Sequence, residues 1–207
     1  MLSGMSMATR IDGSDPYAVV KSVADSLPDG YTVECIDGVI HALPRPKRRH
    51  VHASNRLFTR LRRFHDPEDP GDPGGWVIAE EEELHFGQCI AQVDVVVPDL
   101  AGWKIARVGS TELPVCKPHG YTCLAPDWVA EILSPNTEER DRGSKMELFA
   151  REGVPHVWLV DPIAETLEVF KRAGVGYGVV ARYAGGTKVR AEPFESIELD
   201  LSALWSR

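Results

Sequence analysis

The chain has 207 residues, of which 43% are hydrophobic and 26% are charged, and its formal net charge is −8 at pH 7. This is an ordinary globular composition, which favours one compact domain. The negative charge argues against a protein that coats DNA over its whole surface. No apolar run reaches the roughly 18 residues that a membrane-spanning helix needs, so we expect no membrane segment.

The first elements follow an N-terminal segment that carries no long apolar run. Residues 1–15 lack the apolar core of a signal peptide, so we expect a disordered leader, a cytoplasmic protein and a single domain over 16–207. Residues 16–27 predict a short helix. The segment 31–43 alternates apolar and polar residues around a central Asp-Gly pair, which is typical of a β-hairpin.

Residues 48–65 predict a second, amphipathic helix. Its apolar positions fall on one arc: Val51, Leu57, Phe58, Leu61 and Phe64. Its candidate nucleic-acid-binding residues lie on the remaining arc: Arg49, Arg56, Arg60 and Arg63. The segment 45–65 contains eight Lys or Arg residues and no acid. A basic surface on an acidic protein is compatible with phosphate binding at one face, and equally with a solvated helix face.

The remaining elements define the fold class. A Pro- and Gly-rich loop is expected over 65–75, followed by two strands, 76–87 and 91–103, joined at Gly87-Gln88. After a long loop over 104–125, residues 128–134 form a nearly apolar and therefore central strand. A helix over 138–152 and further strands over 156–162 and 166–172 follow. This order predicts an α+β fold with a mixed central β-sheet flanked by helices.

The four cysteines give a weak metal signal. Cys116, His119 and Cys123 lie close together in sequence, but no second ligand pair follows at the spacing of a zinc site. Because disulfides are scarce in cytosolic proteins, we expect reduced, structural thiols.

Two acidic residues interrupt segments that are otherwise apolar and β-prone. Asp94 lies in VDVVVPD and Glu131 in WVAEILS. Burying a carboxylate is costly unless a cation accompanies it. If the two strands are adjacent, the carboxylates converge and offer oxygen ligands to Mg²⁺ or Mn²⁺. Lys145, near the start of the following helix, is the cation expected beside them, with Arg140 and Arg142 as alternatives.

Four further residues are additional candidates for the site. Glu34, in the first hairpin, either adds to the metal site or pairs with an arginine. His52 lies on the basic helix, where a surface position is the ordinary outcome. Asp141 is suited to helix capping, and Arg142 can replace Lys145 as the cation.

Several motifs together resemble a known family. They are VECIDGVIHALP, VDVVVPDLAGW, and APDWVAEILSPNTEERDRGSKMELFAREGVPHVWLVDP, and they extend over about Tyr31 to Trp205. The chain resembles the Uma-two family of restriction-endonuclease-like proteins, within the PD-(D/E)XK nuclease superfamily. The resemblance implies a restriction endonuclease-like core and a metal-dependent phosphodiesterase.

The resemblance also assigns roles to individual residues. Asp94 matches the first catalytic acid and Glu131 the second, with the carbonyl group of Ile132 as a further metal ligand. Leu133 stands where the superfamily usually has its lysine, and in this family a lysine on the next helix, here Lys145, takes its place. The implied reaction is Mg²⁺-dependent hydrolysis of nucleic acid.

The leading hypothesis is therefore a Mg²⁺-dependent DNA endonuclease. The sequence leaves the oligomeric state open, with a homodimer as one candidate, since nucleases that cut both strands often act as symmetric pairs. The alternative is a catalytically weak or inactive nucleic-acid-binding accessory protein that retains the nuclease fold. The displaced lysine favours the alternative, whereas the two acids together with Lys145 favour the enzyme. An acidic protein–protein module is a third reading, which leaves both buried acids unexplained.

Overall fold

The computed structural model describes residues 8–10, 16–44, 47–66, 68–87, 94–116 and 120–206. The single domain expected over 16–207 comprises two compact units of discontinuous sequence. The first unit contains residues up to 46 together with 83–97 and 115–124, and the second contains 47–82, 98–114 and 125–207. Of the leader expected over 1–15, residues 8–10 form a strand, and the rest lie outside the described residues.

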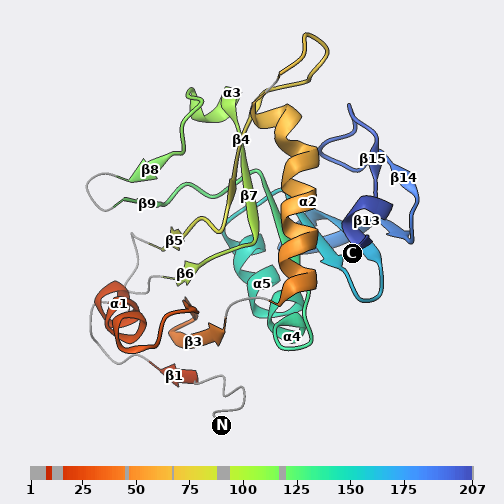
Figure 1. The fold of residues 1–207 in the computed structure, drawn as a ribbon. Coiled ribbons are helices and arrows are strands. Elements are labelled where there is room, and N and C mark those ends of the chain that lie inside the picture. The colour runs from red at the N-terminus through yellow and green to blue at the C-terminus, as the bar shows by residue number, and fades with distance from the viewer. Residues whose placement is uncertain are drawn as a thin grey trace. The chain divides into compact units, whose positions relative to one another are not determined.

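The first unit is built on a seven-stranded sheet with the order β1-β3-β2-β6-β5-β9-β8 (Figure 1). Its elements are β1 (Ala8–Arg10), α1 (Pro16–Ser26), β2 (Tyr31–Ile36), β3 (Val39–Pro44), β5 (Leu84–Phe86), β6 (Asp94–Val96), β8 (Val115–Cys116) and β9 (Tyr121–Thr122). The hairpin predicted around Asp37-Gly38 is confirmed. Both turn residues have positive φ, 52° and 73°, the conformation for which Asp-Gly is suited.

Helix α1 covers one face of this sheet. Val20 packs there with Val33, Cys35 and Val95. Cys35 lies opposite Val95 in the β2–β6 pair, and side chains alternate between the faces of a strand. The residues on either side of these two, including the buried acids Glu34 and Asp94, therefore point to the other face.

Strands β8 and β9 form a short hairpin that the sequence did not predict within the loop over 104–125. Cys116 and Cys123 are joined across it as a disulfide, so the expectation of reduced thiols is wrong for this pair. The reason is local: the hairpin brings the two Cα atoms to 6.1 Å, within the range that a disulfide bridges. His119, the third member of the weak metal signal, lies outside the described residues.

The second unit is built on a six-stranded sheet with the order β13-β12-β11-β10-β7-β4. Its elements are α2 (Arg48–His65), β4 (Trp76–Glu80), β7 (Leu100–Lys104), α3 (Ile105–Val108), β10 (Trp128–Ile132), α4 (Glu138–Arg142), α5 (Ser144–Arg151), β11 (His156–Asp161), β12 (Thr166–Ala173), β13 (Gly176–Ala184), β14 (Lys188–Val189), β15 (Leu199–Asp200) and α6 (Ser202–Trp205). β10 and β11 are parallel and the other pairs antiparallel. The predicted α+β fold with a mixed central sheet flanked by helices is confirmed.

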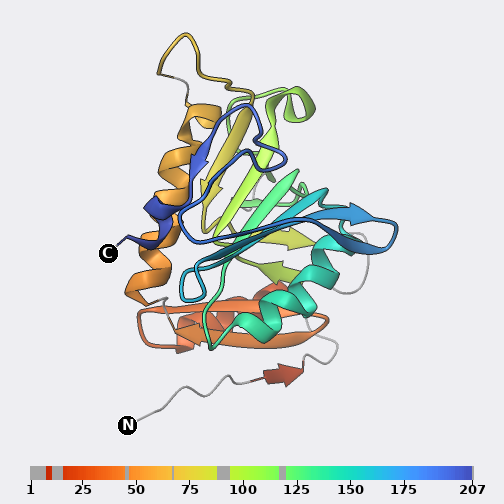
Figure 2. The same ribbon diagram turned by 90° about the vertical axis from the view of Figure 1, so that its right-hand side faces the viewer.

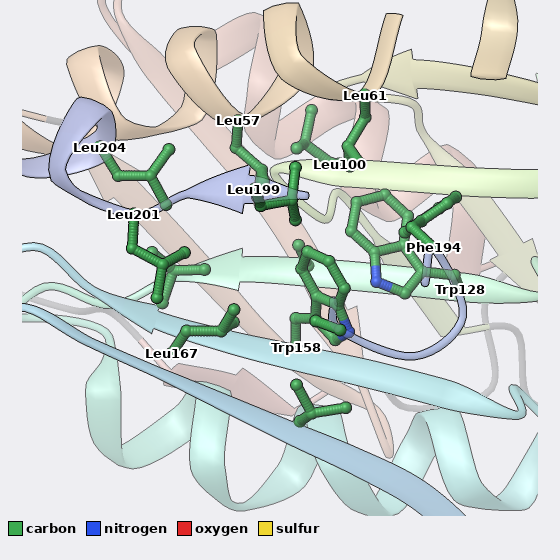
Figure 3. Packing of buried hydrophobic residues seen from close by; sticks show 14 of the residues in the cluster. Leu57, Leu61, Leu100, Trp128, Trp158, Leu167, Phe194, Leu199, Leu201 and Leu204 are labelled. Atoms are coloured by element: carbon green, nitrogen blue, oxygen red, sulfur yellow. The ribbon is translucent and has the colours of Figure 1, made fainter. Parts of the chain in front are cut away.

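The helices of the second unit lie on both faces of its sheet (Figure 2). On one face, Leu57 and Leu61 of α2 join a core with Trp128, Trp158 and the C-terminal segment around Phe194 (Figure 3). Since residues alternate along β10, Glu131 points to the opposite face, which α4 and α5 cover. Val51, expected on the buried face of α2, is 40% exposed, because it lies in the first turn, before the helix meets this core.

Three predicted elements are interrupted. The strand expected over 91–103 contains β6 and β7, which belong to different sheets. The strand expected over 76–87 divides into β4 and β5, which belong to different sheets, and Glu81 between them has a φ of 51°. The helix expected over 138–152 divides into α4 and α5 at Gly143. A Cβ atom at Gly143 would lie 2.9 Å from the carbonyl oxygen of Glu139, so the chain can pass here only without a side chain.

Candidate active site

A buried ion pair lies on the α4–α5 face of the second unit. The Nζ atom of Lys145 is 2.6 Å from Oε1 of Glu131, and the two side chains are 2% and 3% exposed. Every residue of β10 is buried, so the strand places the Glu131 carboxylate where water cannot solvate it. Lys145, in the first turn of α5, supplies the cation that such a carboxylate requires.

A second acid adjoins the same ammonium group. Oδ1 of Asp141 is 3.9 Å from Nζ of Lys145, and its side chain is 4% exposed. Nη2 of Arg140 is 3.5 Å from the same oxygen. Asp141 is therefore a member of the buried charge cluster, and the break at Gly143 orients α4 and α5 so that both contribute to it.

The strand next to β10 carries a different acid from the one expected. β10 pairs with β7 and β11, whereas β6, which carries Asp94, pairs with β2 and β5. The prediction that Asp94 and Glu131 lie on adjacent strands is therefore wrong. Leu100 of β7 lies opposite Ala130, so the residue before it, Asp99, comes beside the end of β10.

Asp99 is bound to the backbone that follows Glu131. The N–H group of Ile132 donates a hydrogen bond of 2.6 Å to Oδ2 of Asp99. Nε2 of His50, on α2, is 3.1 Å from the same oxygen. Sequence reasoning missed both residues. The Pro98-Asp99 pair at the start of a β-strand was the available signal for Asp99, whereas nothing in the sequence distinguishes His50 from its basic neighbours.

Asp94 and Glu34 lie in the first unit, on the sheet face opposite α1. The N–H group of Asp37 donates a hydrogen bond of 2.7 Å to Oδ1 of Asp94, and that of Val97 donates one of 2.9 Å to Oε1 of Glu34. Burial, followed by the charge of Asp94, raises the pKa of the Cys35 thiol to about 11. The convergence of Asp94 with Glu131 stays a prediction.

The alternative cation, Arg142, points elsewhere. Its Nε atom is 2.9 Å from Oε1 of Glu138, and its Nη1 atom contacts Glu168. Glu168, on β12, also binds Arg182 at 2.9 Å. Lys145, and not Arg142, is therefore the cation that lies against Glu131, while Arg140, the other alternative, lies against Asp141.

The arginines of α2 differ in how they are held. Arg63 is bound to Asp72. Arg60 acts on Asp200. The pKa of the Asp200 carboxyl is lowered first by hydrogen bonds from Ser202 and then by the charges of Lys188 and Arg60. Within the described part of the chain, Arg49 and Arg56 are exposed and make no ion pair. His52 is half-buried, and its Nε2 atom has no hydrogen-bond partner among the described residues.

The donor set of the second unit suits a hard divalent cation. Asp99, Glu131 and the carbonyl group of Ile132 all offer oxygen, the ligand type that Mg²⁺ prefers. Among the described residues, no group of three or more His, Cys, Asp or Glu side chains is arranged as a metal cluster. Mg²⁺ does not require one, because it commonly keeps several waters and binds one or two carboxylates.

Comparisons with known proteins place the chain among nuclease-like folds. A crystal structure of "a putative nuclease belonging to DUF820" from Anabaena variabilis ATCC 29413 superposes with a TM-score of 0.66 at 20% identity, over 90% of this chain and 96% of that one. No curated protein matches the sequence. No helix in the described ranges combines the length and apolar character needed to cross a bilayer. The model of the Uma-two family, described as "Putative restriction endonuclease", matches residues 23–202, and the chain therefore belongs to that family.

Proposed function

We propose that this protein is a Mg²⁺-dependent nuclease that hydrolyses phosphodiester bonds, most directly those of DNA. The observation that supports the proposal is the buried Glu131–Lys145 pair, with Asp99 bound to the next peptide group. A buried ion pair is a weak source of stability, since desolvation offsets most of its attraction. Buried charges gathered at the end of a central strand are more simply explained by catalysis.

The proposed roles follow from the chemistry of each group. Asp99, Glu131 and the carbonyl oxygen of Ile132 would hold Mg²⁺, which when bound polarises a phosphoryl oxygen and makes water a better nucleophile. Lys145 donates hydrogen bonds to the attacking water or to the phosphate oxygen on which negative charge develops. Asp141 keeps the Lys145 ammonium group charged and oriented.

Asp94 is the acid to which the sequence assigned the first catalytic role. In the present proposal Asp99 takes that role, because β7 and not β6 is the neighbour of β10. The roles that the sequence suggested for Asp94 and Glu34 stay predictions. Because nucleases that cut both DNA strands often pair as symmetric dimers, a homodimer is the proposed assembly.

The direct test is nicking of a supercoiled plasmid by the purified protein with Mg²⁺, with Mn²⁺ and with EDTA. We expect nicking with either metal and none with EDTA. Glu131→Gln keeps the size of the side chain but removes its charge, and it should lower the nicking rate at least about a hundredfold, the loss of one essential charged group. A Glu131→Gln protein that nicks at the native rate would refute the proposal.

The second candidate function is a DNA-binding accessory protein without nuclease activity. It is favoured by Leu133, which occupies the usual lysine position with an apolar side chain that is 2% exposed. A protein that binds DNA and never nicks it, with either metal, would be the accessory protein of the alternative hypothesis. The plasmid assay combined with a binding assay separates the two.

A further inference from the structure

A cavity of about 490 Å³ opens on the second unit, away from the proposed catalytic residues. It lies between the first turns of α2, the turn that joins β11 to β12, and the C-terminal helix α6. None of Asp99, Glu131 and Lys145 lines it. Its volume is in the range of small-ligand sites, roughly 300–1,000 Å³.

One wall of the cavity is cationic. Arg48 and Arg49 line it, and within the described chain neither guanidinium is paired with a carboxylate. The first turn of α2 contains no acid, and Lys47 at its N-cap makes no capping hydrogen bond. Cations at the positive end of a helix dipole are unfavourable, and an anion bound there relieves both the repulsion and the unsatisfied N–H groups.

The same wall holds an unsatisfied polar atom. His52 lines the cavity, and its Nε2 atom is buried with no hydrogen-bond partner among the described residues. Leaving a buried ring nitrogen unpaired costs free energy. Because this atom is closed off from solvent, a ligand in the cavity reaches it once the His52 ring turns toward the cavity.

Four other lining residues are aromatic or apolar: Pro162, Ile163, Leu204 and Trp205. The indole Nε1–H group of Trp205 donates a hydrogen bond of 2.8 Å to the carbonyl oxygen of Gly185, which fixes the orientation of the ring. Ile163 is 56% exposed, a large apolar side chain left open at the rim. A fixed indole beside aliphatic groups suits a flat heteroaromatic ring.

We propose that this cavity binds one unpaired nucleotide of a nucleic-acid strand. Arg48 and Arg49 hold its phosphate, and its base lies against Trp205 with a polar edge toward His52. The proposal rests on the proposed function in taking nucleic acid as the partner, and it extends that function by adding a site for a base outside the duplex. Glu165 is the acid among the lining residues, and its negative charge repels a phosphate. Removing that charge should therefore strengthen binding, whereas removing the arginines should weaken it.

The test is fluorescence anisotropy in EDTA, so that no strand is cut. The probes are labelled single-stranded oligo(dT), the same strand in a duplex with oligo(dA), and unlabelled thymidine 5′-monophosphate as competitor. Arg48→Ala/Arg49→Ala should weaken single-strand binding about tenfold or more and lower the log–log salt slope by roughly 0.7 for each lost contact. Ile163→Asp, at an exposed position, should weaken it likewise, and Glu165→Gln should strengthen it.

The matched control is Arg62→Ala on the same helix, because Arg62 is already bound to Asp66 and Glu68 and lies outside the cavity. Its affinity for the single strand should equal the native value. Equal losses in Arg62→Ala, or native affinity in Arg48→Ala/Arg49→Ala, would overturn the proposal. Binding of the mononucleotide without binding of the strand would also overturn it, in favour of a free nucleotide.

The nuclease proposal and the cavity proposal can be refuted independently of each other. Intact oligo(dT) binding that depends on Arg48 and Arg49, in a protein that never nicks a plasmid, would refute the nuclease and support the cavity. Native nicking together with single-strand binding that ignores Ile163→Asp and Glu165→Gln would refute the cavity and leave the nuclease in place.

Discussion

Lys145 sets the charge balance of the candidate active site. Its ammonium group lies against Glu131 at 2.6 Å and near Asp141 at 3.9 Å, and all three side chains are almost fully buried. Removing this cation would leave two carboxylates in a place that water does not reach. The residue is therefore expected to matter for stability as well as for catalysis.

We expect Lys145→Met to lower the free energy of unfolding by about 3–5 kcal/mol, the usual loss when one partner of a buried pair is removed. Methionine keeps the apolar stem, so packing changes little. Urea denaturation measures the loss. The double variant Lys145→Met/Glu131→Leu should recover most of it, because no charge is then left unpaired. No difference in stability between the single variant and the native protein would show that water or another cation compensates Glu131.

The Cys35 thiol gives a pH prediction at the same scale. Burial raises its folded-state pKa to about 11 from an ordinary value of 9.0, so its contribution to stability is complete below about pH 9 and is lost as the pH rises toward 11. We expect the stability difference between the native protein and Cys35→Ala to shrink over that interval. Urea midpoints measured at several pH values check this, and a difference that stays constant would contradict the assigned pKa.

Individual residues were predictable from sequence to different degrees. Glu131 and Lys145 stood out because a charge in an apolar strand demands a nearby partner, and the structure brings them together. Asp99 did not stand out, because an acid after a proline reads equally well as a loop residue. Its proximity to Ile132 depends on which strand pairs with β10. The residue pattern within one β-strand does not say which other strand it pairs with.

At the scale of elements, periodicity predicted those whose boundaries are set locally. Helix α2 has the predicted bounds, since its apolar spacing and the loop after it are both visible in the sequence. The division of residues 76–87 into β4 and β5 was not predictable. No Gly, Pro or Asn marks a turn around Glu81, and the change of sheet is decided by tertiary contacts.

Glycine at position 102 lets two aromatic rings pack over the central sheet. A Cβ atom there would lie 3.2 Å from Cε3 of Trp128 and 3.3 Å from Cε3 of Trp76. We expect Gly102→Ala to cost roughly 1–3 kcal/mol, the usual penalty of overpacking. The matched control is Gly178→Ala on β13, where no atom lies within 4 Å of the added carbon. Equal thermal midpoints for the two variants would mean that the indole rings move aside.

The arginines of α2 give a prediction for the helix as a DNA-binding element. Arg56 is exposed without an ion pair among the described residues, whereas Arg63 is bound to Asp72. We expect Arg56→Ala to reduce the slope of log affinity against log salt by about 0.9 on duplex DNA, and Arg63→Ala to leave it unchanged. Binding titrations at several salt concentrations measure both slopes. An unchanged slope for Arg56→Ala would assign this arc to a solvated helix face.

At the scale of the molecule, the chain passes repeatedly between its two units. The paired strands after α2 contribute β4 and β7 to one sheet, and β5 and β6 to the other. The sequence predicted the α+β class, because the elements and their order are locally encoded. It did not predict two sheets, since the crossing at residues 81–83 contains no Pro or Gly and the crossing at 97–99 contains only Pro98.

The assignment of Asp99 rather than Asp94 is the consequence of that division, and it is the central claim about the active site. The measurement that tests it most directly is the Mg²⁺-dependent rate of plasmid nicking by Asp99→Asn and Asp94→Asn, compared with the native protein. Each variant keeps the size of its side chain and one acceptor oxygen, and it removes the negative charge. We expect Asp99→Asn to lose at least about a hundredfold in rate and Asp94→Asn to lose much less. A native rate in Asp99→Asn, together with loss of nicking in Asp94→Asn, would contradict the assignment of Asp99. Asp94, in the first unit, would then be the catalytic acid.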